Sequence, residues 1–107
     1  MNKYIKNYGY LTFQRYNDES TALFLSPDKT YSSEARMVSV NIRSFNSNRF
    51  FNVDINNFSK AEKILQDNNI AYPTGESVKS GWMTYPVYEL TDEAFEEFNR
   101  QINGYGV

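Results

Sequence analysis

The stretch Tyr72–Leu90 constrains the fold of this chain more than any other part of the sequence. It contains the only tryptophan, two of the three prolines and two of the five glycines. Pro73-Thr74-Gly75 and Ser80-Gly81 have the composition of turns, and Trp82–Leu90 after them is aromatic and β-prone. The stretch therefore predicts two turns that lead into an aromatic strand. Because proline cannot donate a ladder hydrogen bond, Pro86 predicts an edge strand or a β-bulge there.

Alternating apolar side chains predict four strands in the first half of the chain. Tyr8–Tyr16 and Ala22–Ser26 flank a short polar turn, so they are expected to pair as a hairpin. Met37–Arg43 alternates most strictly, and Arg49–Ile55 repeats the pattern, which indicates strands with one buried face. The side chains expected to point inward in these last two strands are Val38, Val40, Ile42, Phe51, Val53 and Ile55.

Two helices are predicted after these strands. The first is expected to begin at Ser59, which has the spacing of a capping box with Glu62, and to end at Asn68-Asn69. The second is expected to be capped by Thr91 and to bury a stripe of apolar side chains. Strands that come first and are joined by short turns predict an α+β fold. It should contain an antiparallel sheet of about five to six strands, with two helices packed on one face.

The length of 107 residues corresponds to one domain, so residues 1–107 are expected to fold as a single unit with flexible ends at roughly 1–6 and 103–107. Phe, Tyr and Trp make up 17% of the sequence, and these large side chains can supply a compact core. No segment approaches the ~20 apolar residues of a membrane span, and no apolar signal region follows the N-terminus. The protein is therefore expected in the cytoplasm.

The sequence contains neither cysteine nor histidine. It therefore lacks a thiolate nucleophile and also the commonest general base and the commonest metal ligand. Catalysis would have to rest on carboxylates, Lys, Tyr or Ser without an imidazole, so we expect a protein that is not an enzyme and needs no cofactor or metal. The glycines at 75 and 81 do not match a phosphate-binding loop, and turn chemistry explains them.

Acidic residues gather around the second predicted helix. The net charge is −2, and the acidic excess lies in the second half of the chain. One interpretation is a solvated helix face with acids favoured near the helix N-terminus. The other is an acidic patch that binds a basic surface of a partner protein. The residues predicted to contact a partner are Glu89, Asp92, Glu93, Glu96 and Glu97, together with Tyr85 and Tyr88.

Arginines near aromatic strands suggest an alternative, nucleic-acid-binding face. Some single-stranded RNA binders stack bases on aromatic side chains of a sheet that also carries arginine. The run Arg49–Val53 resembles such a strand but lacks its glycine and its spacing. The net negative charge also argues against binding driven by the phosphate backbone. The residues of this alternative face are Tyr10, Arg15, Arg43 and Arg49.

Three segments occur in a distinctive order: Val38–Ile42, then Phe51–Asn57, then Pro73–Gly75 followed by Ser80–Tyr88. Together they resemble a small uncharacterised domain family of bacterial plasmids, integrative elements and phages, with a TG…SG…YP.Y signature. The resemblance covers roughly residues 36–90. Phe58 stands where some members have cysteine, so no cysteine chemistry is implied, and the resemblance brings no catalytic residues with it.

The resemblance implies a biological setting rather than a chemistry. Small accessory proteins of mobile elements often disable host defence or regulate transfer, and a small acidic chain without His or Cys is similar in kind to anti-CRISPR inhibitors. The implied function is inhibition of a host defence nuclease by protein–protein binding in a bacterial host cell, with a CRISPR effector nuclease of the Cas9 type as partner. The alternative is a single-stranded nucleic-acid-binding regulator of plasmid or phage functions.

Overall fold

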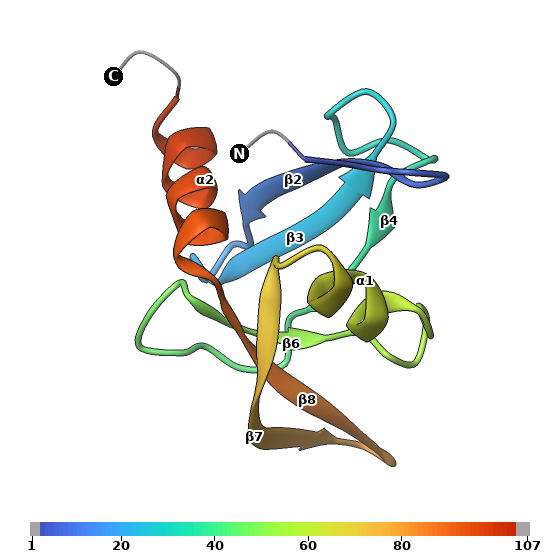
Figure 1. Ribbon diagram of the computed structural model, residues 1–107. Coiled ribbons are helices and arrows are strands. Elements are labelled where there is room, and N and C mark those ends of the chain that lie inside the picture. Colours follow the sequence, from blue (N-terminus) through green and yellow to red (C-terminus); the bar gives the residue numbers. More distant parts are fainter. Residues whose placement is uncertain (1–2, 105–107) are drawn as a thin grey trace.

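Eight strands and two helices follow one another along residues 3–104, the part of the chain that the computed structural model describes (Figure 1). All paired strands run antiparallel, which confirms the predicted α+β class. The elements in chain order are β1 (Tyr4–Ile5), β2 (Gly9–Arg15), β3 (Thr21–Ser26), β4 (Arg36–Met37), β5 (Ser39–Val40), β6 (Phe50–Val53), α1 (Ala61–Asp67), β7 (Ala71–Ser80), β8 (Met83–Leu90) and α2 (Asp92–Asn103).

The strands form two antiparallel sheets of four strands each, in the orders β1-β2-β3-β4 and β5-β6-β8-β7. The α2 helix packs on β2 of the first sheet and also contacts β8 of the second, whereas α1 packs on β7. Figure 1 shows α2 standing beside the end of the β2–β3 hairpin. The sequence predicts a single sheet of about five to six strands. The antiparallel arrangement is therefore confirmed, but the strands divide between two sheets.

The division between the sheets falls at Val38, inside the segment predicted as one strand. The Val38 amide donates to the Leu23 carbonyl in the first sheet at 2.9 Å, and its carbonyl accepts from the Asp54 amide beside the second sheet at 2.9 Å. The Ser39 hydroxyl also accepts from the Leu23 amide at 2.9 Å. One residue that bonds to both sheets cannot lie within a single continuous strand. The prediction of one strand over Met37–Arg43 is therefore wrong, and two short strands replace it.

The side chains buried by both sheets and both helices form one continuous core, and the described residues make a compact globule with a Cα radius of gyration of 12.9 Å. Val38, Phe51 and Val53 were predicted to point inward, and each is at most 2% exposed. Phe13 of β2 meets Phe98 of α2 edge to face, with ring centroids 5.6 Å apart. The other residues predicted to point inward are only half-buried because they lie at or beyond strand ends: Val40, Ile42 and Ile55.

The predicted hairpin of the first half is confirmed as β2 and β3, paired from Tyr10 with Ser26 to Arg15 with Thr21. The β1 strand lies within the segment 1–6 that the sequence indicates as flexible, and its Ile5 is buried in the core. Of the other residues expected to be flexible, 1–2 and 105–107 lie outside the described part of the chain.

The two helices begin differently. Thr91 caps α2 as predicted, because its hydroxyl accepts from the Ala94 amide at 3.2 Å. The capping box predicted for α1 is wrong: the N-cap is Lys60, without a side-chain cap bond, and Glu62 instead accepts from the Tyr88 hydroxyl. Neither helix within residues 3–104 is long and apolar enough to cross a bilayer.

The β8 strand, which carries Pro86, lies between β6 and β7, so the edge-strand interpretation of this proline is wrong. The bulge interpretation is confirmed, because the register between β7 and β8 shifts between Pro73 and Ser77, and Ser77 is the residue opposite Pro86. The turn predicted at Pro73-Thr74-Gly75 is wrong, because these residues lie within β7 at this irregularity of the ladder. The side-chain amide of Asn52 donates to the Pro86 carbonyl at 3.3 Å. A side chain thus supplies a bond at the point where proline interrupts the ladder.

Candidate functional site

Glu97 lies on the buried side of α2 and is not part of an exposed surface. Its side chain is 1% exposed. Its two oxygens accept from Arg100 at 2.9 Å and from the Gln101 amide at 2.7 Å. A buried carboxylate that is paired and hydrogen-bonded in this way stabilises the position of its neighbours. Glu97 is therefore separated from the other acidic residues of the predicted patch.

Arg49 binds two further acidic residues of that patch. Its guanidinium donates to Asp92 at 2.7 Å and to the Leu90 carbonyl at 2.9 Å. Its Nε lies 3.5 Å from Glu89, and the group stacks over the Phe95 ring at 5.1 Å. Glu89 and Asp92 thus share the single positive charge of Arg49. Arg49 connects the start of β6 to the first turn of α2.

Glu93 and Glu96 are the exposed acidic residues of α2 that remain. Within residues 3–104 neither forms an ion pair. They lie three residues apart and so share one helix face. The predicted patch is therefore reduced to these two carboxylates, with Asp92 at its border.

Tyr85 and Tyr88 are buried in the structure rather than displayed. Tyr85 is 9% exposed and Tyr88 is fully buried. The Tyr88 hydroxyl donates to Glu62 at 2.6 Å and accepts from the Gln66 amide at 2.9 Å. Burial, and then the hydrogen bond to Glu62, raise the pKa of Tyr88. Both rings therefore have a packing role, and Tyr88 fixes α1 on the second sheet.

Among residues 3–104, the most exposed aromatic side chain is one that the sequence analysis did not assign to a site. Trp82 is 100% exposed and sits in the two-residue turn between β7 and β8. Gly81 before it has a φ of 60°, as a type II′ turn requires at its first central position. The sequence held a signal for this placement, because the single tryptophan directly follows the Ser80-Gly81 turn.

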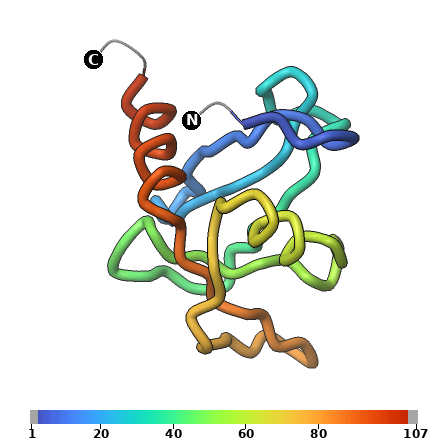
Figure 2. Tube along the Cα trace, in the orientation of Figure 1, coloured from blue at the N-terminus to red at the C-terminus, as the bar shows by residue number. Residues whose placement is uncertain are grey.

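The turn lies at the end of a ribbon that extends beyond the rest of the second sheet. The β6 strand pairs with β8 only from Val87 to Glu89, whereas β7 continues alongside β8 as far as Ser80 and Met83. Figures 1 and 2 show this part of the β7–β8 hairpin projecting away from the sheets and helices. We call residues 76–85 the distal ribbon. Trp82 is thus presented on a two-stranded support, clear of the globule.

The residues of the alternative nucleic-acid face have different surroundings. Arg15 lies 3.5 Å from Glu19, and Arg43 lies over the Phe45 ring at 4.9 Å. Tyr10 is half-buried and contacts the Tyr4 ring edge to face. Arg49 holds α2, as described above. Arg49 is thus engaged within the molecule, whereas Arg15 stays 40% exposed beside Glu19 and Arg43 is exposed.

No group of three or more acidic side chains within residues 3–104 is arranged to hold a metal ion. A family model described as a domain of unknown function (DUF4313) matches residues 10–105. The match runs from β2 through α2 and includes the second sheet and the distal ribbon, whereas β1 precedes it. No curated protein and no solved structure matches the chain.

Proposed function

Because this chain belongs to the DUF4313 family, a domain of unknown function, we propose its role from its surface: it is a non-enzymatic protein that acts by binding a protein partner. The observation that carries the proposal is Trp82, fully exposed at the end of the distal ribbon. Tryptophan is among the residues most enriched at the energetic centres of protein interfaces. A hairpin that projects from the globule can insert such a side chain into a pocket of a partner.

The free energy available from this contact is large for one residue. A tryptophan buries about 150–250 Å², and at about 25 cal/mol per Å² its removal from water is worth roughly 4–6 kcal/mol before the costs of association. Glu93 and Glu96 supply a second feature, a negatively charged helix face with no ion pair among the described residues. Charges of this kind steer association with a basic surface more than they add affinity.

The proposed partner is a host defence nuclease, specifically a CRISPR effector of the Cas9 type. Three features support this proposal: the resemblance to accessory domains of plasmids, integrative elements and phages, the exposed acidic pair, and the projecting tryptophan. Nuclease channels for nucleic acid are basic, so an acidic protein surface can occupy them. In this proposal the protein acts in the cytoplasm of a bacterial host cell and needs no cofactor.

The test is a DNA-cleavage assay with a purified Cas9-type nuclease and increasing amounts of this protein. We expect inhibition that weakens at least tenfold for Trp82→Ala, since the anchor is lost. The double variant Glu93→Lys, Glu96→Lys should weaken inhibition more at low salt than at high salt. Tyr31→Ala, which removes another exposed aromatic ring far from the hairpin in sequence, is the matched control.

Cleavage that is unaffected by a large excess of the protein would contradict the choice of target. Inhibition that Trp82→Ala leaves unchanged would contradict the choice of surface. Retention of single-stranded DNA or RNA by the protein alone at ~50 mM salt would favour the nucleic-acid alternative instead.

A further inference from the structure

Among residues 3–104, the β2 strand has no paired strand on one of its two sides over most of its length. The β1 strand covers only its beginning, where Tyr4 is opposite Tyr10 and Ile5 is opposite Gly9. The last backbone bond on this side joins the Leu11 amide to the Lys3 carbonyl at 2.8 Å. Beyond Leu11 no strand among residues 3–104 pairs with this edge. Within the described part of the chain, the segment Leu11–Arg15 therefore lies at an edge of the first sheet.

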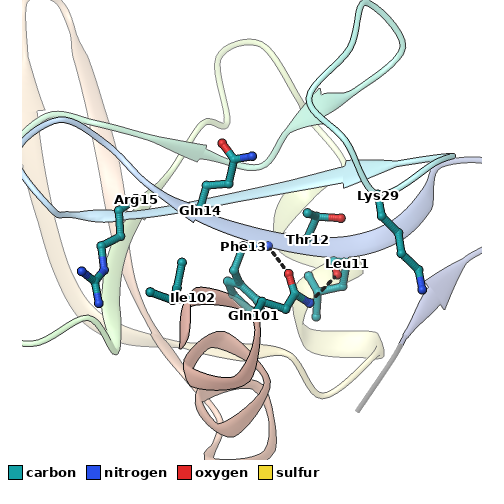
Figure 3. Close-up of a pocket in the computed structure, with 8 residues that line it drawn as sticks. All are labelled: Leu11, Thr12, Phe13, Gln14, Arg15, Lys29, Gln101 and Ile102. Carbon is teal, nitrogen blue, oxygen red and sulfur yellow. Dashed lines mark hydrogen bonds between the residues drawn. The ribbon is translucent and has the colours of Figure 1, made fainter. Parts of the chain in front are cut away.

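The side chain of Gln101 occupies part of the missing neighbour's position. Its Oε1 accepts from the Phe13 amide at 2.8 Å, and its Nε2 donates to the Leu11 carbonyl at 3.2 Å. Figure 3 shows both bonds, with Gln101 reaching up from α2 to the strand. A primary amide carries the same donor and acceptor pair as a peptide group. Gln101 thus substitutes for one peptide unit of an added strand.

Two backbone groups beyond Gln101 face the same side. Backbone groups alternate between the two sides of an antiparallel strand. Because the Leu11 and Phe13 amides point to the open edge, the Phe13 carbonyl and the Arg15 amide point there too. These groups are the donors and acceptors that an incoming strand uses.

A groove of about 530 Å³ runs along this edge between β2 and the last turn of α2. Five consecutive residues of β2, Leu11–Arg15, line it, together with Lys29, Gln101 and Ile102. Consecutive residues alternate between the two faces of a sheet, so a hollow lined by all five follows the backbone edge. At about 3.3 Å per residue, the groove has the length of an extended segment of roughly four to five residues.

The charged side chains of the groove are basic. Figure 3 shows Arg15 at one end of the row and Lys29 at the other. The Lys29 ammonium lies 4.7 Å from the centroid of the Tyr10 ring, and Arg15 is 40% exposed beside its exposed partner Glu19. Cations at both ends of an open strand edge complement an extended segment that carries acidic side chains.

We propose that this β2 edge groove binds an extended acidic segment of a partner protein by strand addition, with the segment displacing the Gln101 side chain. In the free protein Gln101 covers the edge and hinders pairing between edges of different molecules. In the complex, peptide groups of the segment take over the two bonds of Gln101 to β2 and add bonds to the Phe13 carbonyl and the Arg15 amide. This site lies on the first sheet and is independent of Trp82.

The test is an NMR titration of the full chain with a blocked peptide of about seven residues in which Glu and Val alternate. We expect amide shifts and slowed hydrogen exchange at Phe13 and Arg15. Gln101→Ala removes the competing side chain, so the affinity should rise about tenfold. Asn99→Ala, an exposed position on the same helix, is the matched control and should leave the affinity unchanged.

Variants that change the charge of the groove or alter the distal ribbon provide the remaining tests. Lys29→Glu should weaken binding severalfold, and a peptide in which Lys replaces Glu should not bind. Trp82→Ala should leave this titration unchanged, so the groove and the proposed function can fail separately. The proposal is overturned if millimolar acidic peptide leaves the Phe13 and Arg15 amides of Gln101→Ala unperturbed. It is also overturned if an oligothymidylate binds there in preference to the peptide, or if the same amides shift on self-association without peptide.

Discussion

At the scale of residues, the structure redistributes the acidic side chains that the sequence groups together. Glu93, Glu96 and Glu97 look equivalent as charges, yet Glu97 is buried and the other two are exposed. Helical spacing contained this information, because Glu97 is three residues after Ala94 and shares its buried face. The contacts of Arg49 could not be predicted, since its partners Leu90 and Asp92 are 41 and 43 residues away. No local pattern encodes such a pair.

At the scale of residues, we predict how the loss of the Tyr88 hydroxyl changes stability. Tyr88→Phe removes the bonds to Glu62 and Gln66, and we expect a loss of about 1–2 kcal/mol in the free energy of unfolding at neutral pH. Folding raises the pKa of this phenol above its ordinary value of about 10, so the protonated form is favoured in the native state. The stabilisation that the protonated Tyr88 phenol contributes is therefore complete below pH ~10 and is lost as the pH rises further.

Urea unfolding at neutral pH and near pH ~10.5 measures both effects, and the gap between wild type and Tyr88→Phe should narrow at the higher pH. Tyr31→Phe is the control, because Tyr31 is 64% exposed. A gap that widens with pH would contradict the assigned direction of the pKa.

At the scale of elements, local sequence signals predicted the identity of the elements more accurately than the caps of the helices. The β2–β3 hairpin, both helices and β8 are where the sequence indicates them, whereas residues 73–75, predicted as a turn, belong to the strand β7. The cap at Thr91 is confirmed, but the capping box at Ser59 is wrong, because the Glu62 carboxylate binds the hydroxyl of Tyr88, 26 residues after Glu62. A partner brought by the tertiary fold thus replaces the local one, and sequence spacing does not reveal it.

The two helix starts should differ in how much the residue at each contributes to stability. The Thr91 hydroxyl accepts from the Ala94 amide and donates to the Asn69 carbonyl at 3.0 Å, so Thr91→Ala should cost about 1 kcal/mol. Ser59→Ala removes no cap bond and should change stability by less than about 0.5 kcal/mol. Chemical denaturation of the two variants under the same conditions measures the difference in their free energies of unfolding. Equal losses would mean that Ser59 caps α1 after all.

At the scale of the whole molecule, alternation of side chains predicted strands but not the sheet to which each belongs. Val38 bonds to Leu23 on one side and to Asp54 on the other, and both partners are distant in sequence. The two-sheet arrangement therefore follows from long-range pairing that the periodicity of one strand does not contain. The candidate site shares this difficulty. The composition of Ser80-Gly81 indicated a turn, whereas the projection of Trp82 depends on where β6 stops pairing with β8.

The uneven pairing of the second sheet gives the whole-molecule prediction. The distal ribbon has only two strands, and isolated two-stranded ribbons are marginally stable in water. We expect amides at residues 78–84 to exchange with solvent at least tenfold faster than those of β3, whose six residues are all buried. Hydrogen exchange followed by mass spectrometry measures this difference. Uniform protection along β7 and β8 would show that the ribbon is held by contacts outside its own ladder.

The contact between α2 and β2 has a consequence for the newly made chain. The bond from the Phe13 amide to Gln101 spans 88 residues, and Phe98 covers Phe13 from the same helix. The ribosome adds about 5–20 residues per second, so the β2–β3 hairpin waits roughly 4–15 s after its synthesis before α2 exists to cover it. During translation its apolar side is therefore exposed to chaperones and proteases. Once α2 has been made and packs on the hairpin, chaperones and proteases no longer reach this apolar side.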